Sequence, residues 1–387
     1  MKIVYLLPGG LYNSGGMERA VTIKANYLAD KMDYDVSIVT TEQMGRPVFY
    51  PLSEKVHLYH LNIGIHEKFG KESYIEKCIS RVLKTQEYKK ALKKLLAEVR
   101  PDIVISTLGG LDIGFLNDLQ KDSIKIGELH FPGNFRQLMA RKLSDAFIPN
   151  LVAKLRTRTF KRQCEKLDRL IVLTREEKAL WKNQQTIDVI PNPISFLPSE
   201  SSSLLSKKAI AVGRLAYEKG FDLLIEVWKT VAGKHPDWEL NIYGKGNEKE
   251  RLLQLIKENR LEQQIKIHEP VKDIQEKYLE SSLFLLSSRY LEALPMVMLE
   301  AMACGLPLVA FDAPCGPKDI ITDGQNGFLV SSGNMEQFAE KICALIELEE
   351  LRQEMGNASK QLAAGYQVEK IMKLWVDLFE NACKNLK

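Results

Sequence analysis

Two carboxylates stand in the most apolar stretch of the chain, YLEALPMVMLEAMACGLPLVAFDAP, which spans residues 290–314. They belong to Glu292 and Glu300, and a buried carboxylate is costly unless it has a partner. Pro295 suits the first turn of a helix that should end near Gly305. Glu292 then lies in the loop ahead of the helix, and Glu300 lies about five residues inside it, roughly 7 Å further along the axis.

The start of this helix is a candidate phosphate site. A helix N-terminus presents free N–H groups and the positive end of the helix dipole. A sugar nucleotide carries a polyol on each side of its diphosphate, and a carboxylate can accept paired hydrogen bonds from each polyol. The alternative is that Glu292 and Glu300 form local salt bridges or cap the helix.

Two cations lie in the segment GRLAYEKGFDLL, which begins at Gly213. Arg214 stands at the end of an expected strand, and Lys219 stands just ahead of an expected helix. This pair suits a diphosphate, because Arg grips oxygens in a fork and Lys neutralises charge as a point cation. Gly244, in YGKGNEKE, begins a second turn between a strand and a helix.

A third Gly-rich turn, PGGLYNSGGMER, follows the first expected strand. Gly15 and Gly16 permit close backbone approach to a ligand, ahead of a helix expected to begin near Met17. The turn is not the GxGxxG of dinucleotide-binding folds. It indicates a phosphate or sugar contact.

The elements that must position these loops follow an alternating pattern. Short apolar runs alternate with longer amphipathic ones, which is typical of parallel sheets covered by helices. The expected strands are 3–7, 36–40, 56–61, 103–106, 124–129, 170–173 and 188–190, then 209–215, 240–244, 265–271, 283–288, 307–311 and 327–330. We therefore expect an α/β fold of two Rossmann-like, doubly wound domains facing a central cleft.

The Pro- and Ser-rich segment IPNPISFLPSESSSLLSKK reads as a linker between the domains. A chain of 387 residues also exceeds what one core usually holds. We expect one domain over residues 1–191 and a second over 192–365. A last helix over about 366–387 is expected to pack back onto the first domain.

The composition indicates a cytoplasmic protein. The first 30 residues lack the features of a signal peptide, and no apolar run is long enough to span a bilayer. The six cysteines are scattered without a CxxC pair, so we expect neither disulfides nor a zinc site.

The charge is uneven along the chain. Residues 1–200 carry 31 Lys and Arg against 23 acids, a net +8, and the remainder carries 23 against 27, a net −4. Apolar residues interleave with a group of basic residues: Arg136, Arg141, Lys142, Lys154, Arg156, Arg158, Lys161 and Arg162. Such a stretch suits an anionic membrane surface, and the alternative is a solvated helix face above a core-packing stripe. No nucleic-acid-binding motif accompanies it, so we expect no nucleic-acid partner.

The motifs together resemble family 4 of the retaining glycosyltransferases, the group 1 glycosyltransferases, which have the GT-B architecture. The resemblance rests on GGMER, VIPNPI, GRLAYEKGFDLL, YGKGNE and the run from SSRYLEALP to NGFLV. It is strongest over residues 209–332, and it includes the seven-residue spacing between Glu292 and Glu300.

The resemblance implies roles for individual residues. Arg214 and Lys219 would bind the donor diphosphate, Glu292 the transferred sugar and Glu300 the ribose. His130, at the end of KIGELH, resembles the family's active-site histidine. The remaining positions expected to touch the donor are Gly15, Gly16, Gly213, Gly244, Val271, Ala293, Leu294, Met296 and Val297.

Two positions depart from the family pattern. Ala293 stands where Gly often follows the first Glu, so the loop must accommodate a Cβ there. Glu269 and Pro270 stand where Gly is frequent, near the expected base contact at Val271.

The implied reaction is transfer of a hexosyl residue from a nucleoside-diphosphate sugar, with UDP favoured, to a hydroxyl with retained configuration. The resemblance favours front-face attack. A double displacement would need a carboxylate on the far face of the sugar, and Glu128, beside His130, is expected to point away from that histidine. The expected acceptor is a saccharide, preferably lipid-linked, in capsule or other surface polysaccharide assembly at the inner membrane face.

No cofactor or metal is expected, because the two cations and the helix N-terminus already offset the charge of the leaving diphosphate. The DxD sequence Asp33, Tyr34 and Asp35 is interpreted as a turn between a helix and a strand. His57 and His60 are interpreted as strand residues.

Three other functions remain open. A sugar-nucleotide epimerase would need further acids or a base at the sugar. A nicotinamide dehydrogenase would need GxGxxG and a later acid. A catalytically inert donor-binding scaffold would bind a sugar nucleotide without transferring the sugar.

Overall fold

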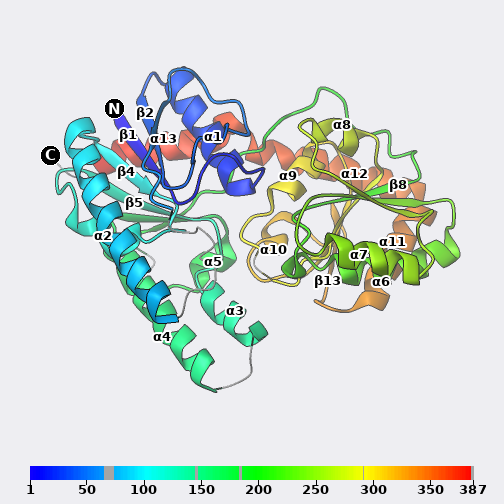
Figure 1. Ribbon diagram of the computed structural model, residues 1–387. Helices are drawn as coiled ribbons and strands as arrows, with labels where there is room; N and C mark the ends of the chain where they lie inside the picture. Colours follow the sequence, from blue (N-terminus) through cyan, green and yellow to red (C-terminus); the bar gives the residue numbers. More distant parts are fainter. Residues whose placement is uncertain (65–73, 144–146, 183–184, 291, 385–387) are drawn as a thin grey trace. The chain divides into compact units, whose positions relative to one another are not determined.

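A computed structural model describes residues 1–64, 74–143, 147–182, 185–290 and 292–384. The chain divides into two compact units, which can be followed by colour in Figure 1. The first comprises Met1–Pro193 together with Ile371–Lys387, and the second comprises Ile194–Lys370.

The first unit is a parallel sheet covered by helices. Its strands, in the spatial order β3-β2-β1-β4-β5-β6-β7, are β1 Lys2–Leu7, β2 Asp35–Thr40, β3 His57–His60, β4 Ile103–Ser106, β5 Ile124–Leu129, β6 Arg169–Val172 and β7 Ile187–Val189. Its helices are α1 Gly16–Asp30, α2 Tyr74–Val99, α3 Phe135–Leu143, α4 Phe147–Cys164, α5 Arg175–Ala179 and most of α13 Val368–Lys384.

The second unit repeats this plan. Its parallel strands, in the order β10-β9-β8-β11-β12-β13, are β8 Lys208–Val212, β9 Glu239–Tyr243, β10 Ile265–His268, β11 Leu283–Leu286, β12 Leu308–Phe311 and β13 Gly327–Val330. Its helices are α6 Phe221–Lys234, α7 Lys249–Glu258, α8 Ile274–Leu279, α9 Met296–Ala303, α10 Pro317–Ile320, α11 Met335–Glu347 and α12 Glu349–Ala363. The predicted α/β fold with two doubly wound parallel sheets is confirmed.

The strands form where the sequence is continuously apolar, because both faces of each sheet are covered. In β1 all five residues from Ile3 to Leu7 are buried. In the second unit, Trp228 of α6 and Phe338 of α11 lie in one core with Phe311 of β12. These cores fix the strand ends, and therefore the places from which the functional loops leave the sheets.

Each sheet reverses its strand order at one point. In the second unit the reversal lies between β8 and β11, so the loops after these two strands, residues 213–220 and 287–295, leave neighbouring positions on the sheet. In open α/β sheets, ligands bind in the crevice at such a switch point. The loops that carry Lys219 and Glu292 are therefore adjacent because of the topology.

The last helix, α13, turns an apolar face to the first unit. Ile371, Met372, Trp375 and Phe379 are buried and follow helical spacing. Among the described residues, no helix is both long enough and apolar enough to cross a membrane. The cysteines whose side chains the structure describes, Cys164, Cys304, Cys315, Cys343 and Cys383, are free thiols.

Candidate functional site

Glu292 lies in the loop after β11 and is paired with a cation from the loop after β8. Its Oε1 lies 2.5 Å from Lys219 Nζ and accepts a hydrogen bond of 2.5 Å from Ser288 Oγ. The Glu292 side chain is 5% exposed and that of Lys219 is 23% exposed. The charged partner offsets the cost of burying the carboxylate, and the Lys219 side chain remains partly exposed.

Glu300 is the fifth residue of α9, and only 1% of its surface is exposed. Its Oε1 accepts a hydrogen bond of 2.6 Å from Ser195 Oγ, and its Oε2 accepts one of 3.2 Å from Tyr278 OH. Both carboxylates thus have partners within the protein. Glu292 forms a salt bridge with Lys219, which is 73 positions away in the sequence, and Glu300 accepts hydrogen bonds from two hydroxyl groups.

Helix α9 begins where the sequence predicts. Pro295 is its N-cap residue, and Met296 and Val297 are its first two residues. Their N–H groups precede the first full turn and so have no acceptor within the helix. After α9, Gly305 takes a positive φ of 76°, which ends the helix as expected.

The loop between Glu292 and α9 accommodates the departure at Ala293. Ala293 is not among the described residues with a positive φ, so its Cβ causes no backbone strain. Leu294 is buried, which anchors the loop beside the helix. A Cβ on Gly316, where φ is 156°, would lie 3.0 Å from Pro295 Cδ and 3.1 Å from the carbonyl oxygen of Ala293. Residue 316 must therefore be small for this loop to pack.

Arg214 shares the loop of Lys219 but points elsewhere. Its Nη2 lies 2.5 Å from Glu218 Oε1, and its side chain is 68% exposed. The structure therefore brings Lys219 directly to Glu292 and leaves the guanidinium of Arg214 at the surface of the same loop.

Glycines allow the loops after β8 and β9 to come together. A Cβ on Gly244 would lie 1.9 Å from the carbonyl oxygen of Gly213, so no other residue fits there. Gly213 N in turn donates to Tyr243 O at 3.0 Å. Val271, expected near the base, follows β10 and is 37% exposed.

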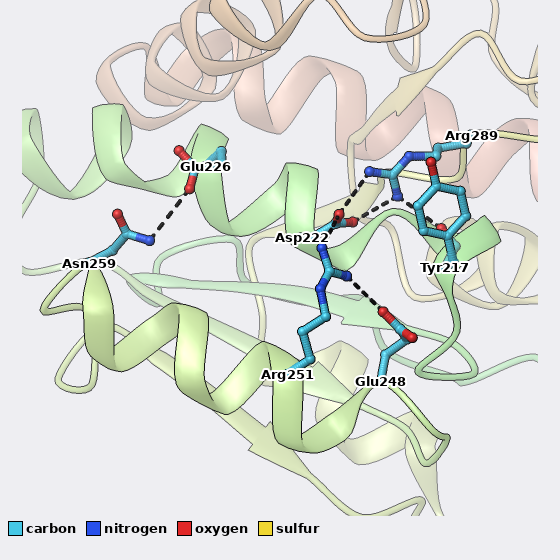
Figure 2. Close-up of polar contacts among 7 residues, drawn as sticks. All are labelled: Tyr217, Asp222, Glu226, Glu248, Arg251, Asn259 and Arg289. Atoms are coloured by element: carbon cyan, nitrogen blue, oxygen red, sulfur yellow. Dashed lines mark hydrogen bonds and ion pairs between the residues drawn. The ribbon is translucent and has the colours of Figure 1, made fainter.

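An Asp222 clamp, consisting of Asp222, Arg289 and Arg251, locks the two site loops together (Figure 2). Arg289 binds both oxygens of Asp222, at 2.7 and 2.9 Å, and donates to Tyr217 O at 2.8 Å. Arg251 Nη2 lies 3.3 Å from Asp222 Oδ2. Burial alone would raise the pKa of Asp222, but the two guanidinium groups lower it below its usual value.

The clamp was not predicted from the sequence. It joins the first turn of α6 to the residue that follows Ser288, and a backbone bond of 2.9 Å from Arg289 N to Glu218 O runs beside it. Ser287 Oγ also donates to Lys219 O at 2.9 Å. The only available signal was an Arg three residues before Glu292, in SSRYLEALP.

In the first unit, His130 lies directly after β5 and is nearly enclosed. Its Nε2 lies 3.2 Å from Oε1 of Glu128. The expectation that Glu128 points away from His130 is wrong, because residues two apart in an extended segment share a face. Glu128 also contacts Lys24 of α1. The alternation of β5 could have identified this carboxylate from the sequence.

Gly15 and Gly16 stand at the start of α1, Gly15 as its N-cap residue and Gly16 as its first residue. Two side chains that follow β2 hold the preceding turn in place. Gly9 N donates to Thr41 Oγ1, and Leu11 N donates to Gln43 Oε1, each at 2.9 Å. This turn leaves the carboxyl end of β1, beside the point where the first sheet reverses its order.

The DxD sequence lies in the turn between α1 and β2, as interpreted. Asp33 has a positive φ of 53°, and Asp35 begins β2. Asp33 faces Lys55 at 3.5 Å, and Asp35 faces His57 at 3.6 Å. In the described part of the chain, no group of three or more His, Cys, Asp or Glu side chains is arranged to hold a metal ion.

Most of the basic residues described belong to α4, which has one buried and one exposed face. Ala153, Thr157, Phe160 and Cys164 are buried at helical spacing. Leu151, Val152 and Leu155 are 42%, 41% and 55% exposed, beside exposed Lys154, Arg156, Arg158 and Arg162. Arg136 lies against the rings of Phe135 and Phe160, and Lys161 lies against Trp181. The side chains of Arg141 and Lys142 lie outside the described residues.

Comparison with known proteins gives consistent matches along the chain. Residues 199–362 match the family described as glycosyl transferases group 1. An uncharacterized glycosyltransferase of Haemophilus influenzae is 32% identical over 368 residues, which cover 94% of this chain and 96% of that protein. The amylovoran biosynthesis glycosyltransferase AmsD of Erwinia amylovora is 30% identical over 385 residues, covering 96% and 98%.

The fold comparison agrees with these matches. A crystal structure of a TarM variant from S. aureus, in complex with fondaparinux, alpha-GlcNAc-glycerol and UDP, has a TM-score of 0.77 at 19% identity, covering 98% of this chain and 99% of that one. This likeness shows the fold, and the predicted GT-B architecture is confirmed. On the family match and on the two relatives matched over nearly their whole length, this chain belongs to the group 1 glycosyltransferases.

Proposed function

We propose that this enzyme transfers a hexosyl residue from a nucleoside-diphosphate sugar to a hydroxyl of a saccharide acceptor, with retained anomeric configuration. The observation that carries the proposal is the contact between Lys219 and Glu292 at the switch point of the second sheet, just ahead of α9. A cation, a carboxylate and a helix N-terminus at one place provide the groups that a sugar diphosphate requires.

The donor is proposed to lie along the loops after β8 and β11. Its diphosphate would bind Lys219, Arg214 and the N–H groups of Met296 and Val297. Glu292 would accept hydrogen bonds from hydroxyls of the transferred sugar. Glu300, at present bonded to Ser195 and Tyr278, would accept them from the ribose.

The chemistry depends on departure of the diphosphate. Groups that bind negative charge more strongly as it develops lower the barrier for this step. Lys219, Arg214 and the start of α9 would supply that stabilisation without a divalent ion. By family resemblance we assign His130 to the reacting sugar, and Gly15 and Gly16 to the phosphate.

UDP is the favoured nucleotide and a surface polysaccharide the favoured product. The similar TarM variant was crystallised with UDP, and AmsD is named for amylovoran biosynthesis. The exposed apolar and basic residues of α4 suit an anionic membrane surface, where a lipid-linked acceptor would be presented. We therefore place the enzyme in the cytoplasm, peripheral to the inner face of the membrane.

A screen of UDP- and GDP-sugars tests the proposal. A ligand that binds the native state raises the melting temperature, and a UDP-sugar should do so equally with and without EDTA. The stabilising donor is then incubated with saccharide acceptors, and NMR of the product gives its anomeric configuration. Stabilisation without transfer or slow donor hydrolysis would identify a scaffold, and conversion of the donor to an epimer would identify an epimerase.

A further inference from the structure

Three ionisable side chains are in contact in the core of the first unit, and the last of them is His130. Lys24 extends inward from α1, and its Nζ contacts Oε1 of Glu128 on β5. The same oxygen lies 3.2 Å from His130 Nε2. The three side chains are 0%, 1% and 5% exposed, respectively. Lys24 of α1 and His130 in the loop after β5 thus contact the same buried carboxylate oxygen of Glu128 on β5.

The C-terminal helix completes the surroundings of Lys24. Its Nζ lies 4.8 Å from the ring centre of Trp375 on α13 and 5.9 Å from that of Tyr5 on β1. A cation within about 6 Å of an aromatic face is attracted to it. Burial lowers the pKa of Lys24, and the adjacent Glu128 opposes that effect.

The carboxylate is strongly biased toward its ionised form. Burial alone would raise the pKa of Glu128, but the adjacent Lys24 and His130 side chains lower it to about 2. Its second oxygen, Oε2, is buried and makes no hydrogen bond with the described residues. Among these residues, Lys24 and His130 are therefore its polar partners.

Stability is a weak reason to bury such an ion pair. The cost of removing two charges from water often exceeds the attraction between them, so an apolar pair of similar volume is commonly neutral or stabilising. A histidine whose ring must be held in one orientation needs an acceptor for the proton on its other ring nitrogen, and a carboxylate can serve as that acceptor. A buried carboxylate in turn needs a buried cation to remain ionised.

We propose that Glu128, held in place by Lys24, is the positioning residue of His130. The carboxylate keeps a proton on Nε2 and fixes the ring, which leaves Nδ1 as the acceptor that faces a ligand. The inference rests on the proposed function only where it identifies that ligand as the transferred sugar. The 3.2 Å contact is not aligned as a full hydrogen bond. Contacts of this kind at reactive sites commonly tighten when the ligand binds.

The first test determines by NMR which ring nitrogen of His130 carries the proton. The full chain is labelled with ¹⁵N-histidine, and the signal of His130 among the six histidines is assigned with His130→Asn. For a neutral imidazole, long-range ¹H–¹⁵N spectra distinguish the two tautomers. We expect the Nε2–H form in the parent protein and a mixture of both forms in Lys24→Met/Glu128→Leu, which replaces the ion pair by apolar side chains. A parent signal from the Nδ1–H form, or the same tautomer in parent and variant, would overturn the proposal.

Asp112→Asn is the matched control. Asp112 is likewise fully buried in the first unit, but its Oδ2 accepts a hydrogen bond from Ser106, and no contact joins it to His130. This variant should keep the tautomer of the parent protein. If it changes the His130 signal as the double variant does, a general loosening of the unit explains both results and the proposal fails.

The second test uses turnover. The double variant should lower kcat at least 10-fold while the shift in melting temperature caused by UDP stays within error, because Lys219 and α9 are unchanged. Unchanged kcat with a changed tautomer would overturn the positioning role. If the parent transfers no sugar from any donor, the proposed function fails, whereas the tautomer experiment still decides the contact between Glu128 and His130.

Discussion

Lys219 Nζ lies 2.5 Å from Glu292 Oε1, although the two residues are 73 positions apart. Each belongs to a loop that follows one of the two strands flanking the switch point of the second sheet. The ion pair is partly exposed on its lysine side and buried on its glutamate side. A sugar diphosphate entering here would meet a cation that already holds the carboxylate in place.

Replacing Glu292 by Ala should lower kcat by about 100-fold or more, because the transferred sugar would lose its positioning contact. The protein should remain folded, since Lys219 is partly exposed and can be solvated. Turnover with the stabilising UDP-sugar measures the effect. Glu347→Ala, which removes an exposed partner of His235, serves as the control and should match the parent. Parental turnover in Glu292→Ala would refute the assignment.

Glu300→Gln should act mainly on donor binding. The amide keeps the size of the buried side chain but removes the charge that we assign to the ribose hydroxyls. Hydrogen bonds to a charged group contribute about 1.5–3 kcal/mol, so the Kd of UDP should rise roughly 10- to 100-fold. Calorimetric titration with UDP measures this change. Equal affinity in parent and variant would remove Glu300 from the donor site.

Arg289→Ala should destabilise the second unit and weaken donor binding together, because it opens the Asp222 clamp. Loss of the two-point contact leaves a largely buried carboxylate with a weaker partner, at a cost of about 1–3 kcal/mol. Arg251→Ala is the matched control: its guanidinium touches the same Asp222 but is 56% exposed, so the cost should stay below about 1 kcal/mol. Urea unfolding distinguishes the two variants, and equal losses would contradict the clamp.

The buried ion pair of the first unit predicts a specific acid response. Burial and the neighbouring charges together set the pKa of Glu128 at about 2 instead of 4.5. A carboxyl group with a lowered pKa in the folded state contributes stability that is complete above its unfolded pKa and is lost as the pH falls through its folded pKa. Between about pH 4.5 and 2, the parent should therefore lose more stability than Lys24→Met/Glu128→Leu.

Urea midpoints at several acid pH values measure this difference. Asp112→Asn provides a contrast, because burial raises the pKa of Asp112, so its contribution to stability is present at low pH and is lost as the pH rises. The double variant and Asp112→Asn should thus diverge from the parent in opposite senses. A constant difference between parent and double variant across this range would contradict the assigned ionisation of Glu128.

The exposed face of α4 predicts binding to anionic lipid. In Leu151→Ser/Leu155→Ser, sedimentation with vesicles that contain anionic lipid at low salt should fall several-fold, because both apolar contacts with the bilayer are lost. Leu253→Ser, on α7, removes a leucine of similar exposure from the second unit and should leave sedimentation unchanged. If the parent does not sediment with the vesicles, the proposed membrane association is refuted.

The sequence predicted the elements well because apolar runs specify buried parallel strands directly. The strands at 103–106, 124–129 and 327–330 have the expected limits. The start of α9 was equally predictable, since Pro295 cannot continue a helix toward its N-terminus but suits its beginning. The contact between Glu128 and His130 was also within reach, because strand alternation places residues two apart on one face.

The partners of the acidic residues were not predictable in the same way. Glu300 bonds to Ser195 and Tyr278, and Asp222 bonds to Arg289, but no local pattern in the sequence links these pairs. Each contact depends on where a sheet order brings distant loops together, and on rotamers that the surrounding core permits.

The sequence by itself determined the two doubly wound sheets, the glycine turns and the placement of Glu292 and Glu300 around a helix start, because these follow from hydrophobic periodicity and backbone preference within short segments. Only the tertiary structure decided that Lys219 rather than Arg214 contacts Glu292, and that Lys24 from α1 meets Glu128 beside His130. These contacts depend on long-range packing. A buried charged group is costly unless it is paired, so it pairs with the oppositely charged group that the fold places nearby.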